Sequence, residues 1–152
     1  MFFEEQIIFK NTNINEVVLG MLNRINVSIN EVEKFFPNLY LRCPEELFYF
    51  LKAKVKYRKD PPGKELIMKL STFVKNNYEG DCDDFTVISI SLLKYFGFSK
   101  IFVKLVGNKA TSPSHVYCIV YDYCTNAFVP FDLTNERYGD ERYYKYYQLI
   151  EV

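Results

Sequence analysis

One segment of this 152-residue chain is apolar on nearly every face that a helix would present. From Phe85 to Phe96, Ile88 and Leu92 share a helical face with Phe85, and further apolar residues fill the other faces. A helix of this kind is stable only when other elements cover most of its surface. The segment therefore predicts a central, buried helix that stops at Gly97.

Helical patterns precede this segment. A short amphipathic stretch covers residues 13–22, and Ser28 with Glu31 has the spacing of a capping box that would open a helix ending at Pro37. Pro44 suits the first turn of a further helix. The remaining expected features of the first half are a turn at Asp60–Gly63 and a helix or loop over 66–74.

The hydrophobic period changes in the second half. Residues 101–106, 115–121 and 127–133 have the pattern of strands, with a loop at 107–113. Pro130 suggests an edge strand or a bulge, because proline donates no ladder hydrogen bond. Helices followed by strands predict an α+β fold in which the helical N-terminal half packs on an antiparallel sheet.

Charge and composition argue against several classes of protein. Lys plus Arg and Asp plus Glu number 19 each, so no overall charge favours nucleic acid or an anionic membrane as a partner. No stretch reaches the roughly 18 apolar residues that span a bilayer, and the acidic start at residues 1–5 is unlike a signal peptide. We expect one soluble, cytoplasmic domain over 1–152, with a virion-associated location as the alternative.

The four cysteines follow no metal-binding or dense disulfide spacing. With His115 as the single histidine, neither zinc nor any other metal or cofactor is expected. The spacing favours free thiols in a reducing compartment. Cys118 is expected to point away from the face that carries His115, and Cys124 to be an exposed thiol in a turn.

Cys82 begins the expected central helix. The positive end of a helix dipole favours a thiolate, which is the nucleophilic form of cysteine. Asp81 could cap the helix with Asp84 as its reciprocal partner. Together with Asp83, however, these carboxylates oppose ionisation of the thiol, so a nearby cation such as His115 is required. The three aspartates could instead hold Ca²⁺, but they lack the spacing of an EF-hand loop, and capping is the favoured interpretation.

His115 and Asp132 lie on two strands that flank one turn. A hairpin centred on Tyr123 and Cys124 would place His115 directly opposite Asp132, with Cβ atoms roughly 5 Å apart. At that distance, a carboxylate can orient one imidazole nitrogen while the other faces a thiol. A bulge at Pro130 would shift this register.

Three motifs in this order resemble those of the transglutaminase-like superfamily. Gly80–Phe85 is similar to its nucleophile motif, His115–Tyr117 to its histidine strand and Val129–Thr134 to its aspartate strand. Tyr57–Pro61 resembles the lead-in of many microbial members. The resemblance covers about residues 44–135.

The resemblance implies a papain-like core with a catalytic triad of Cys82, His115 and Asp132. Family activities include protein crosslinking, peptide or amide hydrolysis and deglycosylation, so a peptide or protein substrate is implied. The backbone N–H of Cys82 is a candidate oxyanion donor. The family's second donor is often a side chain upstream of the nucleophile, and Tyr57 and Tyr78 are the unassigned candidates here.

Each of these residues also has a structural interpretation. Cys82 could be an ordinary buried thiol, His115 a satisfied strand histidine, and Asp132 a turn residue. Some members of the transglutaminase-like superfamily have lost their activity, and compact microbial members occur in phage and prophage settings. The alternative function is therefore a non-catalytic binding or structural module, with a vestigial triad. The aromatic run at 142–147 could then serve an interface, although packing on the domain is favoured.

Overall fold

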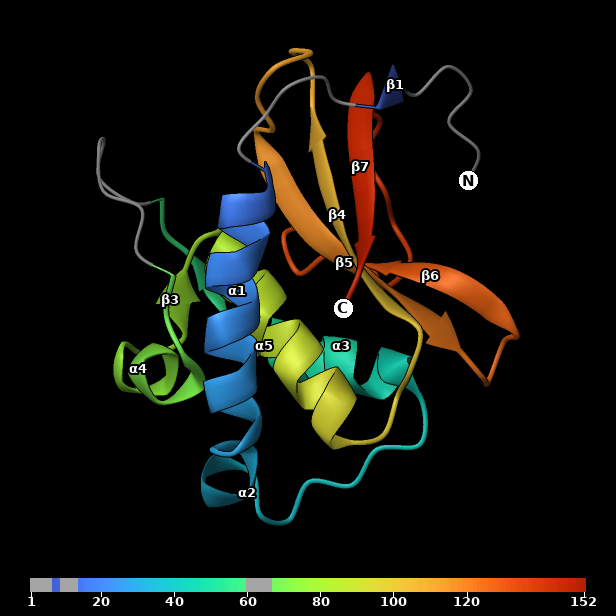
Figure 1. The fold of residues 1–152 in the computed structure, drawn as a ribbon. Coiled ribbons are helices and arrows are strands. Elements are labelled where there is room, and N and C mark those ends of the chain that lie inside the picture. Colours follow the sequence, from blue (N-terminus) through green and yellow to red (C-terminus); the bar gives the residue numbers. More distant parts are fainter. Residues whose placement is uncertain (1–6, 9–13, 60–66) are drawn as a thin grey trace.

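The computed structural model describes residues 7–8, 14–59 and 67–152 and has helices packed against a five-stranded sheet (Figure 1). The helices are α1 (Ile14–Ile29), α2 (Val32–Phe35), α3 (Pro44–Lys52), α4 (Leu70–Lys75) and α5 (Cys82–Tyr95). The strands are β1 (Ile7–Ile8), β2 (Lys56–Tyr57), β3 (Glu79–Gly80), β4 (Ile101–Gly107), β5 (His115–Asp122), β6 (Ala127–Phe131) and β7 (Tyr146–Glu151).

The large sheet has the strand order β1-β7-β4-β5-β6. All neighbours from β7 to β6 are antiparallel, and only β1 joins in parallel, beside β7. β2 and β3 form a separate parallel pair. The expected α+β class and antiparallel sheet are confirmed. Within the described ranges, no helix has the length and apolar character needed to cross a membrane.

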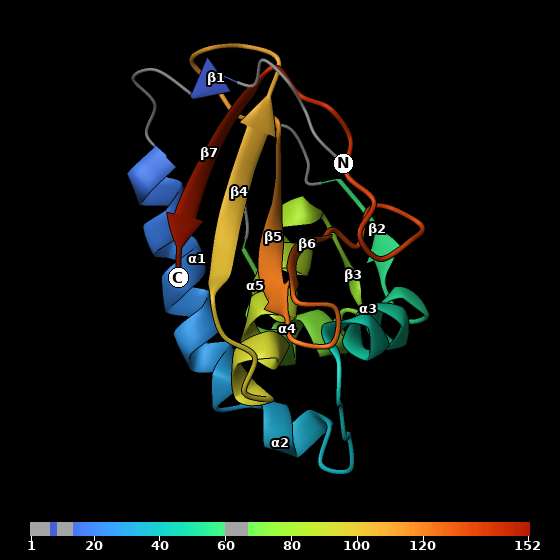
Figure 2. The same ribbon diagram turned by 90° about the vertical axis from the view of Figure 1, so that its right-hand side faces the viewer.

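Helix α5 is the buried centre that its sequence predicts. Every residue from Asp84 to Leu93 is buried. The helix passes behind β4 and β5 in Figure 2, and it packs against β5 and α1. It ends at Tyr95, and Gly97 follows with a φ of +87°, a left-handed conformation that glycine adopts without a steric penalty.

The predicted capping box of Ser28 and Glu31 is wrong. α1 continues through Ser28, which is fully buried, and its Oγ donates to the carbonyl of Arg24. The same Oγ accepts from the N–H of Leu70 at 2.9 Å, and Glu31 Oε1 accepts from the N–H of Ser71 at 3.1 Å. These side chains therefore satisfy the first amides of α4, a helix distant in sequence.

The other helix signals of the first half agree better with the structure. Pro44 is the first residue of α3, and Glu46 Oε1 accepts from the N–H of Cys43 at 2.8 Å. α2 ends at Phe35, just before Pro37. Helix α4 lies within the 66–74 segment and one residue beyond it. The turn expected at 60–63 lies outside the described residues.

Three of the strands lie where the sequence predicts them. β6 is an edge strand, as Pro130 indicates, but it ends at Phe131 rather than at residue 133. The sequence did not predict β7, which runs beside β4 with Val103 opposite Ile150. The strand is short and half-exposed and begins with two tyrosines, so its sequence shows no clear alternation of apolar and polar residues.

Two of the four cysteines are not free thiols. Cys43 and Cys124 form a disulfide that ties the start of α3 to the turn between β5 and β6. The expectation of an exposed thiol at Cys124 is therefore wrong. The two residues are 81 positions apart, so no local spacing reveals the pair. Cys82 and Cys118 are free, and Cys118 is buried on the inner face of β5, away from the face of His115.

Candidate active site

A reciprocal cap holds the N-terminus of α5. Asp81 Oδ1 accepts from the N–H groups of Asp83 and Asp84 at 3.1 and 3.4 Å, and Asp84 Oδ2 accepts from the N–H of Asp81 at 3.1 Å. The other oxygen of Asp84 accepts from the N–H of Met68 at 2.8 Å. Capping is thus confirmed for Asp81 and Asp84. Among the described residues, no cluster of His, Cys, Asp or Glu has the arrangement of a metal site.

Gly80 allows this cap to form. A Cβ at this position would lie 2.7 Å from Asp84 Oδ2 and 2.9 Å from the ring of Phe73. Those distances are too short for any side chain, so the chain can approach α5 closely only with glycine here. The approach fixes where Cys82 begins the helix.

The first turn of α5 lies directly against β5. Thr86 Oγ1 is 2.7 Å from the carbonyl oxygen of Cys82 and 3.2 Å from that of Val116, within hydrogen-bond distance of both. A backbone hydrogen bond with Val116 also acts on the Cys82 thiol. Since Val116 follows His115 in β5, the thiol lies beside the strand position of the histidine.

The Cys82 thiol is protonated at neutral pH. Burial raises its pKa from an ordinary 9.0 to about 12, and the negative charge of Asp83 adds to the rise. The backbone hydrogen bond with Val116 lowers the pKa, whereas Asp81 and Asp132 raise it further. The helix N-terminus therefore does not give the expected thiolate, because burial and the neighbouring carboxylates outweigh it.

His115 and Asp132 are paired. His115 Nε2 lies 2.7 Å from Asp132 Oδ2, and the two side chains are only 12% and 6% exposed. The second carboxylate oxygen, Oδ1, accepts from the N–H and the hydroxyl of Thr134 at 3.0 and 2.7 Å. Each oxygen of Asp132 thus has a defined partner, and the carboxylate holds the imidazole in one orientation.

The pair forms in a register that differs from the predicted one. The loop between β5 and β6 comprises residues 123–126, with Asn126 at a φ of +54°. Extending the observed pairing places Thr134, not Asp132, opposite His115. This shift is by two residues, which keeps the same face of the hairpin because side chains alternate with a period of two. Asp132 therefore still reaches His115, as a diagonal neighbour just beyond the end of β6.

Two tyrosine rings lie beside the imidazole. The ring centroids of Tyr117 and Tyr144 are 5.6 and 5.9 Å from that of His115, with interplanar angles of 32° and 28°. The hydroxyl of Tyr117 donates to Glu141, which forms an ion pair of 2.7 Å with Lys104. The side chains of Lys104 and Glu141 are 7% and 8% exposed.

The sequence did not predict this network, although Tyr117 shares the strand face of His115. Burial and the bond to Glu141 raise the pKa of Tyr117, and burial raises that of Tyr144. Within the aromatic run, Tyr144 packs on the domain as expected, whereas Tyr143 is 50% exposed.

A pocket of about 450 Å³ opens at His115. Its lining residues are Lys52, Val55, Tyr57, Phe85, His115, Leu133, Thr134, Glu136 and Arg142. Lys52 donates to the carbonyl of Leu133 at 2.9 Å, and Arg142 donates to that of Thr134 at 3.3 Å. Of the two tyrosines considered as oxyanion donors, Tyr57 lines this pocket and Tyr78 does not.

The similarity of this chain to known proteins is found at the level of structure. No family model matches the chain, and no curated protein matches it. A similar solved structure is that of a putative cysteine protease from Cytophaga hutchinsonii, with a TM-score of 0.49 and 13% identity. The match covers 84% of this chain and 46% of the other, so the chain spans about half the length of that structure.

Proposed function

We propose that this chain is a cysteine-dependent enzyme that hydrolyses or transfers the acyl group of peptide or protein amides. The catalytic residues are Cys82, His115 and Asp132, in the papain-like arrangement of the transglutaminase-like superfamily. One observation carries the proposal. The thiol at the start of α5 interacts with the backbone of Val116, next to a histidine whose ring Asp132 holds at 2.7 Å.

The protonated thiol determines the first step of the mechanism. With a pKa of about 12, Cys82 has almost no thiolate at neutral pH, so His115 must take the thiol proton as Sγ attacks the carbonyl carbon. Nε2 of His115 is hydrogen-bonded to Asp132, so Nδ1 is the nitrogen that receives the thiol proton. The Asp132 carboxylate stabilises the imidazolium that forms.

Collapse of the tetrahedral intermediate uses the same proton. The imidazolium donates it to the amine nitrogen as the C–N bond breaks, and the acyl group stays on Sγ as a thioester. Water or an amine then attacks the thioester, with His115 again taking the proton, and the thiol leaves. The backbone N–H of Cys82, at the positive end of α5, is the proposed donor to the oxyanion.

The pocket at His115 is the proposed entry for the substrate. Lys52 and Arg142 each donate to a backbone carbonyl of the segment after Asp132, so this wall of the pocket is tied to the body of the protein. Tyr57 is exposed on another part of the wall and is the better placed of the two oxyanion-donor candidates. A fixed wall favours a defined orientation of the bound amide.

The proposed catalytic domain extends beyond the region of motif resemblance, over residues 1–152. Two observations support this extent. α1 packs along α5, and β7 pairs with β4 over six positions. Removal of either flank would expose apolar surface of the core.

A panel of amide substrates tests the proposal, with release of amine or ammonia as the measurement. We expect Cys82→Ala and His115→Ala each to reduce turnover by about 10³-fold or more, with unchanged circular dichroism. Cys118→Ala is the matched control, because Cys118 is the other free thiol and is fully buried. Full turnover by Cys82→Ala on a working substrate would disprove the assignment.

The alternative is a non-catalytic binding or structural module. The observation that favours it is the partial burial of Cys82, which raises the pKa of the thiol and suits an inert residue. This alternative predicts no turnover of any amide in the panel and a stable protein partner in the native setting. A phage or virion assembly rests on the family resemblance alone.

A further inference from the structure

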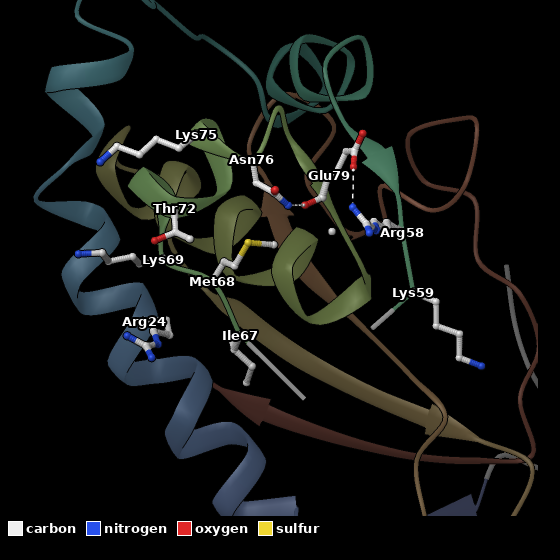
Figure 3. Close-up of a pocket in the computed structure, with 11 residues that line it drawn as sticks. Arg24, Arg58, Lys59, Ile67, Met68, Lys69, Thr72, Lys75, Asn76 and Glu79 are labelled. Atoms are coloured by element: carbon white, nitrogen blue, oxygen red, sulfur yellow. Dashed lines mark hydrogen bonds and ion pairs between the residues drawn. The ribbon is translucent and has the colours of Figure 1, made fainter. Parts of the chain in front are cut away.

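A second pocket, of about 550 Å³, lies among α1, α4 and the β2–β3 pair (Figure 3). Among the described residues, five cationic side chains and one carboxylate line it. These residues are Arg24, Arg58, Lys59, Lys69, Lys75 and Glu79. The whole chain has equal numbers of cationic and anionic side chains, so this pocket concentrates positive charge that the remainder of the molecule balances.

Ion pairing in the described part of the chain neutralises only a part of this charge. Arg58 lies 3.4 Å from Glu79, and Lys69 lies 4.0 Å from Glu31, which is outside the pocket. The Arg58–Glu79 pair is largely exposed, and such pairs are weak enough for a stronger anion to compete. The described lining residues therefore retain an excess of positive charge.

The shape of the pocket points to a compact ligand. Its volume is within the range of about 300–1,000 Å³ that is typical of small-molecule sites. The cations come from α1, α4 and the segments next to β2 and α4, and Figure 3 shows Arg24, Lys69 and Lys75 on one side and Arg58 and Lys59 on the other. Ile67 and Met68 supply apolar wall, and Thr72 and Asn76 supply polar groups.

We propose that this pocket binds a small organic polyanion with several phosphate or carboxylate groups. Guanidinium groups bind either kind of oxyanion through paired hydrogen bonds, and ammonium groups add point charges. The organic part of the ligand would contact Ile67 and Met68. This proposal does not depend on the catalytic proposal.

The pocket shares residues with the elements that support the candidate active site. Gly80, which allows the cap of α5, is also part of the pocket wall. α4 reaches α5 through the rings of Phe73 and Phe85, whose centroids are 6.1 Å apart. A ligand in this pocket would therefore contact α4 and Gly80, both of which support the start of α5.

Isothermal titration calorimetry of the full chain tests the proposal, with inorganic tripolyphosphate and citrate as probes. We expect one site per chain for at least one probe, with affinity that decreases as NaCl increases. Arg24→Gln combined with Lys75→Gln should weaken binding by about tenfold or more. Both side chains are exposed, so the fold should persist.

The matched control combines Lys34→Gln with Lys109→Gln, which removes the same charge from exposed positions outside the pocket. It should bind like the unmodified chain, and Cys82→Ala should as well, which separates this test from that of catalysis. Binding of both probes supports recognition of multivalent charge, and binding of one identifies the oxyanion. Absence of saturable binding, equal affinity in the Arg24/Lys75 variant, or tighter binding of an oligoglutamate peptide than of tripolyphosphate would overturn the proposal.

Discussion

The buried network beside His115 and the cationic pocket use charged side chains in opposite ways. The Lys104–Glu141 pair, which the hydroxyl of Tyr117 connects to the surroundings of His115, is 2.7 Å long, with side chains that are only 7% and 8% exposed. In the cationic pocket, the Arg58–Glu79 pair is 3.4 Å long, with side chains that are 71% and 33% exposed. The same chemical interaction, between a cation and a carboxylate, is thus buried and fixed in one region and solvated in the other.

This difference shows what each region can do. A buried pair stabilises one geometry, because loss of either partner leaves a charge without compensation in a medium of low polarity. An exposed pair contributes little to stability, and its members can exchange partners when a ligand arrives. The first arrangement suits the orientation of a catalytic imidazole, and the second suits the binding of an anion.

Of the variants that test this difference, Lys104→Met should have the largest effect. The substitution leaves Glu141 buried beside Tyr117, and we expect the free energy of unfolding to decrease by about 3–5 kcal/mol. Urea unfolding followed by circular dichroism measures this change. Lys104→Met combined with Glu141→Gln removes the uncompensated charge and should recover a large part of the loss. A loss below about 1 kcal/mol in the single variant would show that the pair is not buried as described.

An intermediate effect is expected for the reactivity of Cys82. Burial first, and then Asp83, raises the pKa of the thiol to about 12, so alkylation by iodoacetamide should keep accelerating well above pH 9. Asp83→Asn should lower this pKa and speed alkylation at pH 8 by roughly two- to tenfold. Mass spectrometry of the labelled peptide gives the rate, and Asp140→Asn is the control because Asp140 is not among the causes of the raised pKa.

The same pKa has a consequence for stability. The folded state favours the neutral thiol, so Cys82 contributes fully to stability below pH 9, and this contribution decreases as pH rises from about 9 to 12. A rate of alkylation that levels off below pH 9 would contradict both statements.

The smallest effect should come from Arg58→Gln in the cationic pocket. Because its partner Glu79 is accessible to water, the free energy of unfolding should change by less than about 1 kcal/mol. The same urea titration provides the comparison with Lys104→Met. If Arg58→Gln were as destabilising as Lys104→Met, the exposed Arg58–Glu79 pair would also stabilise the fold. The distinction between a buried structural pair and an exposed pair available to a ligand would then be wrong.

Local signals in the sequence predicted much of the fold. The cap formed by Asp81 and Asp84, the start of α3 at Pro44 and the edge position of Pro130 each depend on residues a few positions apart. The predicted hairpin correctly paired His115 with Asp132 although its register was wrong. A register error of two residues leaves each side chain on the same face of the strand.

Features that depend on distant contacts could not be predicted in the same way. The Cys43–Cys124 disulfide connects residues that only the folded chain brings together. The raised pKa of Cys82 comes mainly from burial, which the helix-dipole argument leaves out. The pairing of Lys104 with Glu141 likewise has no local pattern, since the two residues are 37 positions apart.

The caps that Ser28 of α1 and Glu31, two residues after its end, provide for α4 have a consequence for local opening of the protein. α4 is only six residues long, and its first amides are satisfied by Ser28 and Glu31 rather than by its own flanking residues. If α1 moves away, α4 loses these acceptors at the same moment, so the two helices should open and close as one cooperative unit. The amide protons of Leu70 and Ser71 therefore report, through their exchange with deuterated water, on the docking of a helix some 40 residues earlier in the chain.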